Sequence, residues 1–360
     1  RQGAFAYAAL ATAGAKNGLL FDAERQALYS VNRTLSSVMR FAYGAGGWSV
    51  DSISLPGVDA VALSPDGKTL VATARPASIV LLDPATLERK GTYEAAYVGS
   101  DINSLQRLAI TNDGRAYFNG GIRDGHSLTY FDLVTRTFGG VDGPAGGWGS
   151  GWFSVAGDGS RLNVVQTASV SPAPSALYLD SSDAILKPNP VDIKFWYEAA
   201  QSLRGERFVE GTYTVWDRDF NMIGKLGTPD QGYFGRTPVL SPDGKRTYVL
   251  AYPPLGQWSD AAGKPRVYVY DSSARLVTST ELPLLGYFEL ADFPTCSISA
   301  YECDTRAQGA ISPDGKTLFF IGDSKLVVAP IPALTMAAQG ARTAGATRAA
   351  PAMTRVRMGN

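Results

Sequence analysis

One phrase recurs along this chain and constrains its fold more than any other feature. It reads Ser-Pro-Asp-Gly-Lys and stands at 64–68, 241–245 and 312–316, with weaker copies at 112–115 and 157–160. Asp-Gly supplies the positive φ angles of a tight turn, and Pro pre-sets the φ angle on the way into it. A short apolar run follows each copy, so each is predicted to be a hairpin turn between two strands. A hairpin that returns at a regular period indicates a repeat fold.

The spacing of these turns divides the chain into seven units. The first five turn positions are 44 to 47 residues apart, and the last interval, from 243 to 314, is 71 residues long and must contain insertions. Taken together, the turn positions are Asp22, Asp66, Asp113, Asp158, Gly205, Asp243 and Asp314.

Each unit contains further strand-like runs after its turn. Second strands are predicted at 27–31, 69–74, 115–118, 161–165, 207–209, 246–250 and 317–321. Third strands, often closed by Asp, are predicted at 79–83, 128–132, 176–180, 213–217 and 267–271, and fourth strands at segments such as 48–55 and 276–282. Four short strands in a unit of about 40 to 50 residues are typical of a β-propeller blade. The sequence therefore predicts an all-β, seven-bladed propeller with four-stranded antiparallel blades.

The two ends of the chain are expected to meet in this ring. The last unit lacks an outer strand after 326–328, and an apolar run at 4–10 precedes the first unit's own inner strand. We expect this N-terminal strand to complete the seventh blade, since such a closure removes an exposed sheet edge.

The repeated turn, the apolar strand after it and the strand ending in Asp resemble the YVTN-type β-propeller repeats. The resemblance covers most of residues 18 to 330. That family occurs in exported bacterial surface proteins and has lactonase-like relatives and quinoprotein-like dehydrogenases among its neighbours. The resemblance implies the fold and an exported protein, in the periplasm, at the cell surface or secreted. It does not decide among activities, because the shared residues form turns and strands.

Composition narrows the remaining classes. The net charge is zero and there is no basic tract, which argues against a nucleic-acid partner. No apolar run approaches the roughly 18 residues of a membrane span. The Ala-rich start lacks the basic-then-apolar order of a signal peptide, so we expect any such peptide to have been removed.

The chain is predicted to divide at 332/333. Residues 1–332 form the propeller, whereas residues 333–360 are rich in Ala, Thr, Gly and Arg. Four arginines in this segment meet no acidic residue, and it has too little apolar surface to fold alone. It is predicted to be a linker or tail, either solvated or leading to a partner or a further domain.

The two cysteines, Cys296 and Cys303, lie in one predicted insertion. We expect them to form a disulfide that staples this loop, which would agree with an oxidising compartment. A reduced pair is the alternative. A zinc site is not expected, because two thiols need further ligands and the chain has a single His.

The long, varied loops are predicted to gather on one face, here called the top, opposite the short Asp-Gly turns. Long loops on a rigid scaffold usually carry function, and glycines beside aromatic rings leave flat surfaces for stacking. The alternative for several of these rings is that they plug the blade tops. The arginines before inner strands have two alternative roles, binding an anion or forming structural pairs, with Asp59 a partner for one of them. The candidate binding residues are Trp148, Trp152, Tyr233, Phe234, Arg236, Tyr252, Trp258, Tyr287, Phe288, Arg306, Arg107 and His126.

The residues give little support to catalysis. Nothing places a nucleophile beside His126, and no Cys-x-x-Cys-His haem motif is present. A metal-dependent lactonase would need ligands on the inner strands, for which Asp59, Asp101, Asn103 and Glu198 are the candidates. The other inner-strand residues are mostly neutral, so we expect no metal, no cofactor and no catalytic residue.

These observations predict a non-catalytic exported propeller that binds a protein or glycan partner through its top face. The alternative is a lactonase-like hydrolase with an active site at the channel mouth. A third interpretation, a structural repeat in a surface coat, predicts self-assembly.

Overall fold

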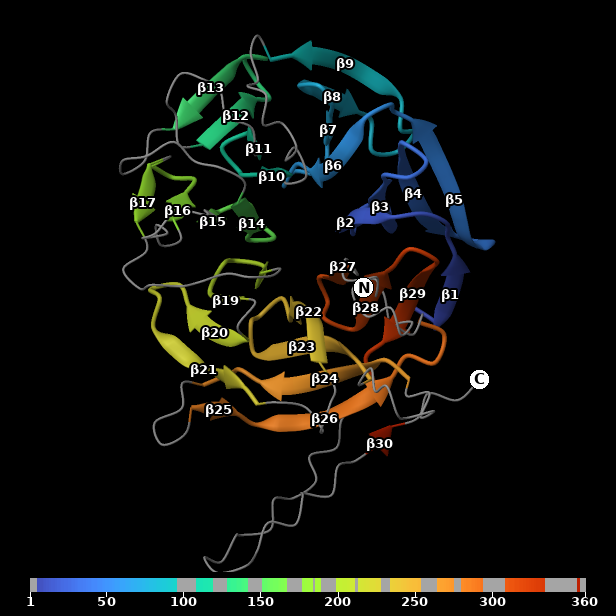
Figure 1. Ribbon diagram of the computed structural model, residues 1–360, viewed down its shortest axis with the longest axis vertical. Helices are drawn as coiled ribbons and strands as arrows, with labels where there is room; N and C mark the ends of the chain where they lie inside the picture. The colour runs from blue at the N-terminus through green and yellow to red at the C-terminus, as the bar shows by residue number, and fades with distance from the viewer. Residues whose placement is uncertain are drawn as a thin grey trace, which may run out of the picture.

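The computed structural model describes residues 5–95, 108–118, 128–141, 151–166, 177–183, 185–188, 199–210, 213–227, 234–253, 264–274, 280–293, 308–333 and 355–356. Seven sheets stand around a central axis, each built on four antiparallel strands (Figure 1). This confirms the predicted all-β, seven-bladed propeller. Within the described ranges, no helix is long and apolar enough to cross a membrane.

The strands of each blade follow one another outwards from the axis. Blade 1 contains β2 (Lys16–Asp22), β3 (Ala27–Asn32), β4 (Ser37–Gly44) and β5 (Gly47–Ser54). Blade 2 contains β6 (Val58–Leu63), β7 (Leu70–Ala74), β8 (Ser78–Leu82) and β9 (Arg89–Glu94). Blade 3 contains β10 (Leu108–Ile110), β11 (Arg115–Phe118), β12 (Leu128–Asp132) and β13 (Phe138–Val141). Blade 4 contains β14 (Gly151–Val155), β15 (Arg161–Gln166), β16 (Leu177–Asp180) and β17 (Leu186–Pro188).

Blades 5 and 6 carry a fifth strand each, and blade 7 includes the N-terminal strand. Blade 5 contains β18 (Ala200–Gln201), β19 (Arg207–Val209), β20 (Thr214–Asp217), β21 (Met222–Leu226) and β25 (Glu281–Leu282). Blade 6 contains β22 (Phe234–Leu240), β23 (Arg246–Tyr252), β24 (Arg266–Asp271), β26 (Leu284–Glu289) and β30 (Arg355–Val356). Blade 7 contains β27 (Gln308–Ile311), β28 (Thr317–Ile321), β29 (Lys325–Pro330) and β1 (Ala8–Ala11).

The N-terminal strand closes the ring, as predicted. Strand β1 pairs antiparallel with β29, from Ala8 opposite Val328 to Ala11 opposite Lys325. Lys16, only 1% exposed, strengthens the junction, because its Nζ donates to the carbonyl oxygens of Ala13 at 2.7 Å and of Asp323 at 3.3 Å. Side chain and backbone thus tie blade 1 to blade 7.

One strand prediction was wrong. The segment 276–282 was predicted as the fourth strand of the sixth blade, but β25 pairs in parallel with β21 and extends blade 5. The packing explains this, since Leu282 is buried in the cluster between blades 5 and 6. Its side chain packs closely on Gly224 of β21, where an added Cβ would lie only 2.8 Å from Leu282 Cδ2. The fourth strand of blade 6 is instead β26, in a segment that the sequence had assigned to an insertion.

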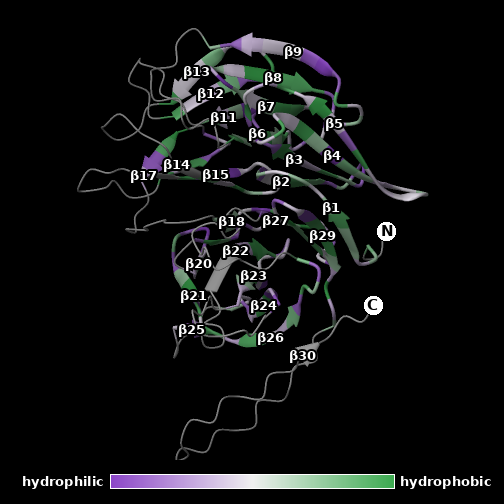
Figure 2. Cartoon of the chain, turned by 45° about the vertical axis from the view of Figure 1, so that its right-hand side comes forward, coloured by the Kyte–Doolittle hydropathy of each residue, from purple (hydrophilic) through white to green (hydrophobic). Residues whose placement is uncertain are grey.

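Apolar clusters fill most of the seams, by which we mean the contacts between neighbouring blades. Such clusters occupy seams 1–2, 2–3, 3–4, 5–6, 6–7 and 7–1. Figure 2 shows the same layering, with hydrophobic colour on the buried strand β8 and hydrophilic colour along the exposed outer strand β9. Among the described residues, seam 4–5 has no such cluster.

Beyond residue 333, the C-terminal segment is described at two residues only. Arg355 and Val356 form β30, which pairs in parallel with Tyr287 and Phe288 of β26 at the outer edge of blade 6. The division of the chain at 332/333 stays a prediction.

Candidate functional site: the central channel

The central channel runs between the seven inner strands. At the end bordered by the Asp-Gly turns it widens to a cavity of about 500 Å³, lined by Asp22 and Asp66 at its rim and by apolar side chains such as Leu63, Ile110 and Val239 further in. Such a wall favours contact with apolar or neutral groups.

The other end of the channel is more polar. A second cavity of about 270 Å³ lies there and includes Asn17, Ser154, Gln201 and Gln308 in its lining. Asn17 donates through Nδ2 to the carbonyl oxygen of Asp59 at 2.5 Å, and Gln201 donates through Nε2 to the carbonyl oxygen of Ser154. These amide and hydroxyl groups carry no charge, and they can bind and orient a neutral ligand by hydrogen bonds.

The candidate metal ligand Asp59 is engaged in ion pairs. It is 2% exposed, and its carboxylate accepts from Nε of Arg75 at 2.6 Å and lies 3.5 Å from Nε of Arg33. The hydrogen bond from Arg75 also raises the pKa of that guanidinium. Asp59 is thus a structural partner of Arg75 and Arg33, from the loops after β7 and β3. The predicted pairing with an arginine before an inner strand stays a prediction.

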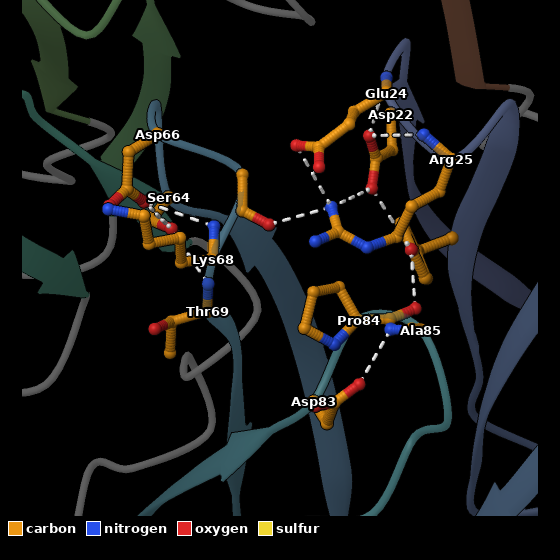
Figure 3. A network of polar contacts seen from close by, with 12 residues as sticks. Asp22, Glu24, Arg25, Ser64, Asp66, Lys68, Thr69, Asp83, Pro84 and Ala85 are labelled. Carbon is orange, nitrogen blue, oxygen red and sulfur yellow. Dashed lines mark hydrogen bonds and ion pairs between the residues drawn. The ribbon is translucent and has the colours of Figure 1, made fainter.

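The recurrent Asp-Gly turns use their own polar groups. Figure 3 shows the turn of blade 2, in which the Ser64 hydroxyl donates to Asp66 Oδ1 at 2.7 Å and accepts from the Thr69 N–H at 2.9 Å. The hydrogen bonds from the Ser64 hydroxyl and then from the Lys68 N–H lower the pKa of Asp66. The copies at Ser241 and Ser312 repeat the serine–aspartate bond at 2.6 Å. These carboxylates are structural.

The same view shows how neighbouring turns are joined. Arg25 Nη1 donates to Asp22 Oδ2 and to the carbonyl oxygen of Gly67, both at 2.9 Å, so the turn of blade 1 grips that of blade 2 (Figure 3). The Tyr29 hydroxyl donates to the carbonyl oxygen of Pro84 at 2.6 Å. The turn face of this seam is thus cross-linked by polar contacts.

Three of the predicted binding rings lie in the core. Tyr252 is 1% exposed, Phe288 0% and Tyr287 7%. Tyr252 and Phe288 pack in the cluster of seam 6–7, and Tyr287 packs in that of seam 5–6 beneath the Arg266 guanidinium, 4.3 Å from its ring centre. Their burial fits the packing alternative.

The other candidates are not brought together by the described structure. Trp152, Phe234 and Arg236 belong to strands β14 and β22, and their side chains lie outside the description. The following predicted residues lie outside the described residues altogether: Arg107, His126, Trp148, Tyr233, Trp258, Cys296, Cys303, Arg306, Asp101, Asn103 and Glu198. The binding and disulfide predictions stay predictions.

Sequence reasoning missed the polar side of the channel. Asn17, Gln201 and Gln308 stand in short inner strands whose sequences give no hint of which face is inward. A usable signal existed elsewhere, two residues after the predicted start of each second strand, where Asn163 is the polar exception. Among the described residues, no three of His, Cys, Asp and Glu gather closely enough to hold a metal ion.

No family model and no curated protein matches the chain. Solved propellers resemble it in fold. The β-propeller domain of Swd1 from Myceliophteria thermophila superposes with a TM-score of 0.61 at 9% identity, over 90% of this chain and 100% of that one. A chain of the mitotic checkpoint complex gives a TM-score of 0.60 at 15% identity, over 90% and 93% of the two chains.

Hydrazine synthase from Kuenenia stuttgartiensis is similar to the same degree. Its TM-score is 0.60 at 13% identity, over 90% of this chain and 97% of that one. At such identities the likeness shows the fold alone. The protein is a β-propeller, and its function has to be argued from its own residues.

Proposed function

We propose that this protein is a non-catalytic propeller of the YVTN-type class, exported from the cytoplasm, that holds a protein or glycan partner through its top-face loops. The Ser-Pro-Asp-Gly-Lys repeats support the class. The similar structures leave both binding and catalysis open, since one belongs to the mitotic checkpoint complex and another is hydrazine synthase.

The observation that carries the proposal is the state of Asp59. Of the four candidate metal ligands it is the one that the structure describes, and two arginines already hold its carboxylate. A carboxylate in such pairs stabilises the wall of the channel mouth and is poorly placed to bind a metal ion. The carboxylates of the Asp-Gly turns likewise accept hydrogen bonds within their own turns, and we place the partner on the top loops, whose sequences are rich in aromatic residues.

The test compares three immobilised forms of the protein in the envelope and secreted fractions of its source. They are the wild type, a variant with Trp148, Trp152, Tyr233 and Phe234 changed to Ala, and a control with Val134→Ala and Ile185→Ala. The control residues are 81% and 58% exposed and lie beside the turns of blades 3 and 4. We expect one partner to be retained by wild type and control and lost by the four-aromatic variant, with thermal unfolding little changed.

Equal retention by a folded four-aromatic variant would contradict the proposed surface. Retention of the protein's own copies alone would instead support a coat of self-assembling propellers. Hydrolysis of simple lactones by the wild type, abolished by a chelator, would overturn the non-catalytic assignment.

A further inference from the structure

Seam 4–5 is built from polar and aromatic side chains. On blade 4, Ser154 lies opposite Asn163, and Asn163 lies opposite Tyr178. On blade 5, Gln201 lies opposite Phe208, which lies opposite Trp216. Residues directly opposite one another in a sheet share a face. We call the two facing sets the polar seam.

Asn163 differs in polarity from the equivalent residue of the other six blades. It stands two residues after the turn closes, on the face toward the next blade. The equivalent residues all belong to the apolar cluster shared with that next blade. They are Tyr29, Val71, Tyr117, Val209, Tyr248 and Phe319. A polar residue at this one position calls for a specific explanation.

Several buried polar atoms of this seam lack hydrogen-bond partners. Six such side-chain atoms belong to five residues here. They are Ser154 Oγ, Arg161 Nε, both amide atoms of Asn163, Gln201 Oε1 and Trp216 Nε1. Ser154 is 6% exposed and Asn163 2%. Buried polar groups are nearly always hydrogen-bonded, because leaving one unpaired costs about 1–3 kcal/mol.

The charges of the seam balance one another. Arg161 Cζ lies 4.3 Å from the ring centre of Tyr178 and 4.8 Å from that of Phe220. Arg161 Nη1 lies 3.9 Å from Asp180 Oδ1. Arg218 reaches the same carboxylate at 2.9 Å, and Lys187 pairs with Asp180 and Asp183. Asp219 is a further carboxylate near Arg161. Three cations thus face three carboxylates, so the seam offers no net charge to an ion.

The inner end of the seam opens on the channel. Ser154 and Gln201 both line the 270 Å³ cavity, and Gln201 Nε2 bonds across the seam to the Ser154 carbonyl oxygen. Ser154 Oγ can donate or accept, and Gln201 Oε1 accepts. Asn163 continues the polar strip outward on the neighbouring strand.

We propose that the cavity beside Ser154 and Gln201 is a binding site for a small uncharged molecule rich in hydroxyl or amide groups, such as a neutral sugar. Both Ser154 Oγ and Gln201 Oε1 are buried and unpaired in the free protein, so the two side chains would turn toward the cavity to pair with the ligand's hydroxyl or amide groups. A charged molecule would lose hydration and gain little in return, because the cations and carboxylates of the seam already pair with one another. This site is distinct from the top-face loops of the proposed function.

The probes are glucose, N-acetylglucosamine and, as a charged counterpart, glucuronic acid. Each is titrated into the whole protein by calorimetry and soaked into crystals. We expect a neutral probe to bind beside Ser154 and Gln201, and Ser154→Ala to weaken it by about three- to tenfold, the value of one hydrogen bond. The control Ser30→Ala removes another buried hydroxyl, in blade 1, and should leave affinity unchanged.

Each other outcome overturns the proposal. The first is that crystals soaked at the highest soluble concentrations of both neutral probes show only ordered water beside Ser154. The second is that glucuronic acid binds more tightly than the neutral probes. The third is that Ser154→Ala and Ser30→Ala weaken binding equally. Since Ser154 Oγ has no partner in the described protein, its removal is expected to leave the fold intact, and a melting curve checks this.

Discussion

Seams 1–2 and 4–5 join neighbouring blades of one ring by different forces. Seam 1–2 is filled by buried apolar side chains such as Leu70, Val80 and Leu82, and Arg25 bridges its turns. Seam 4–5 places Arg161 and Asn163 at positions of the same strand that face the next blade. Seam 1–2 is held by apolar contacts that stabilise in proportion to the buried area, whereas seam 4–5 combines buried aromatic rings such as Phe208 and Phe220 with buried polar groups that cost free energy when unpaired.

The difference indicates that stability is unevenly distributed around the ring. Six apolar seams hold the propeller closed, so a seventh can carry polar groups without unfolding it. Sites that bind ligands commonly give up local stability in this way. We therefore expect seam 4–5 to contribute least to the stability of the ring and to contain the groups that recognise a ligand.

The largest effect is expected from Leu70→Ala in seam 1–2. Leu70 is 0% exposed, and removing a fully buried leucine side chain costs about 2–5 kcal/mol through lost burial and the cavity left behind. Denaturant unfolding measures the change. The exposed Leu35→Ala serves as the control and should change the free energy of unfolding by less than about 0.5 kcal/mol. A loss below that value at Leu70 would show that seam 1–2 does not stabilise the ring.

The opposite sign is expected at seam 4–5. Asn163→Leu replaces two unpaired amide atoms by an apolar side chain of similar size, so the free protein should gain about 1–2 kcal/mol in its free energy of unfolding. The same denaturant titration tests this, alongside Val71→Asn at the equivalent position of blade 2, which should destabilise. A loss of stability in Asn163→Leu would mean that the amide is paired in solution.

A smaller effect concerns alkaline pH at seam 3–4, where Tyr117 stands in the position of Asn163. Burial raises the pKa of Tyr117 to about 12, above its ordinary value of 10.0. The folded state therefore holds the proton more tightly than the unfolded state, and this contribution to stability is complete below pH 10 and is lost as pH rises toward 12. Tyr117→Phe should lose less stability than the wild type over that window. Parallel pH curves would contradict the assignment.

The smallest effect concerns acid at the turns. The Ser64 hydroxyl holds the pKa of Asp66 below its ordinary value, so its contribution to stability is present above that value and is lost as pH falls through the folded-state pKa. Asp66→Asn should therefore flatten the acid limb of the stability curve slightly. The wild-type and variant curves, measured from pH 6 to pH 2 by chemical denaturation, should converge at the acid end. An unchanged acid limb would show that this carboxylate is indifferent to folding.

The fold could be predicted because a few residue types with known backbone preferences form its turns. Gly67 and its counterparts have positive φ, so Asp-Gly marks five of the seven hairpins, and the second strands begin at Ala27, Arg115 and Thr317 as predicted. The assignment of β25 to blade 5 was missed because an apolar residue such as Leu282 fits the core of either blade 5 or blade 6. Only the structure shows that it packs on Gly224 in blade 5.

The candidate sites were harder to predict for a different reason. An aromatic residue reads alike whether it caps a blade or fills a seam, and Tyr252 and Phe288 fill seams. The polar seam was visible in one respect, since Asn163 follows its turn where other units have an apolar residue. Its meaning depends on Ser154 and Gln201, which only the closed ring brings together.

Hydrogen exchange followed by mass spectrometry tests the central claim, that seam 4–5 is the weak and polar seam of an otherwise apolar ring. We predict that the amides of β15 and β19 exchange at least about tenfold faster than those of β3 and β7, because opening seam 4–5 exposes less apolar surface. Equal protection of the two pairs of strands, or slower exchange in β15 and β19, would contradict it.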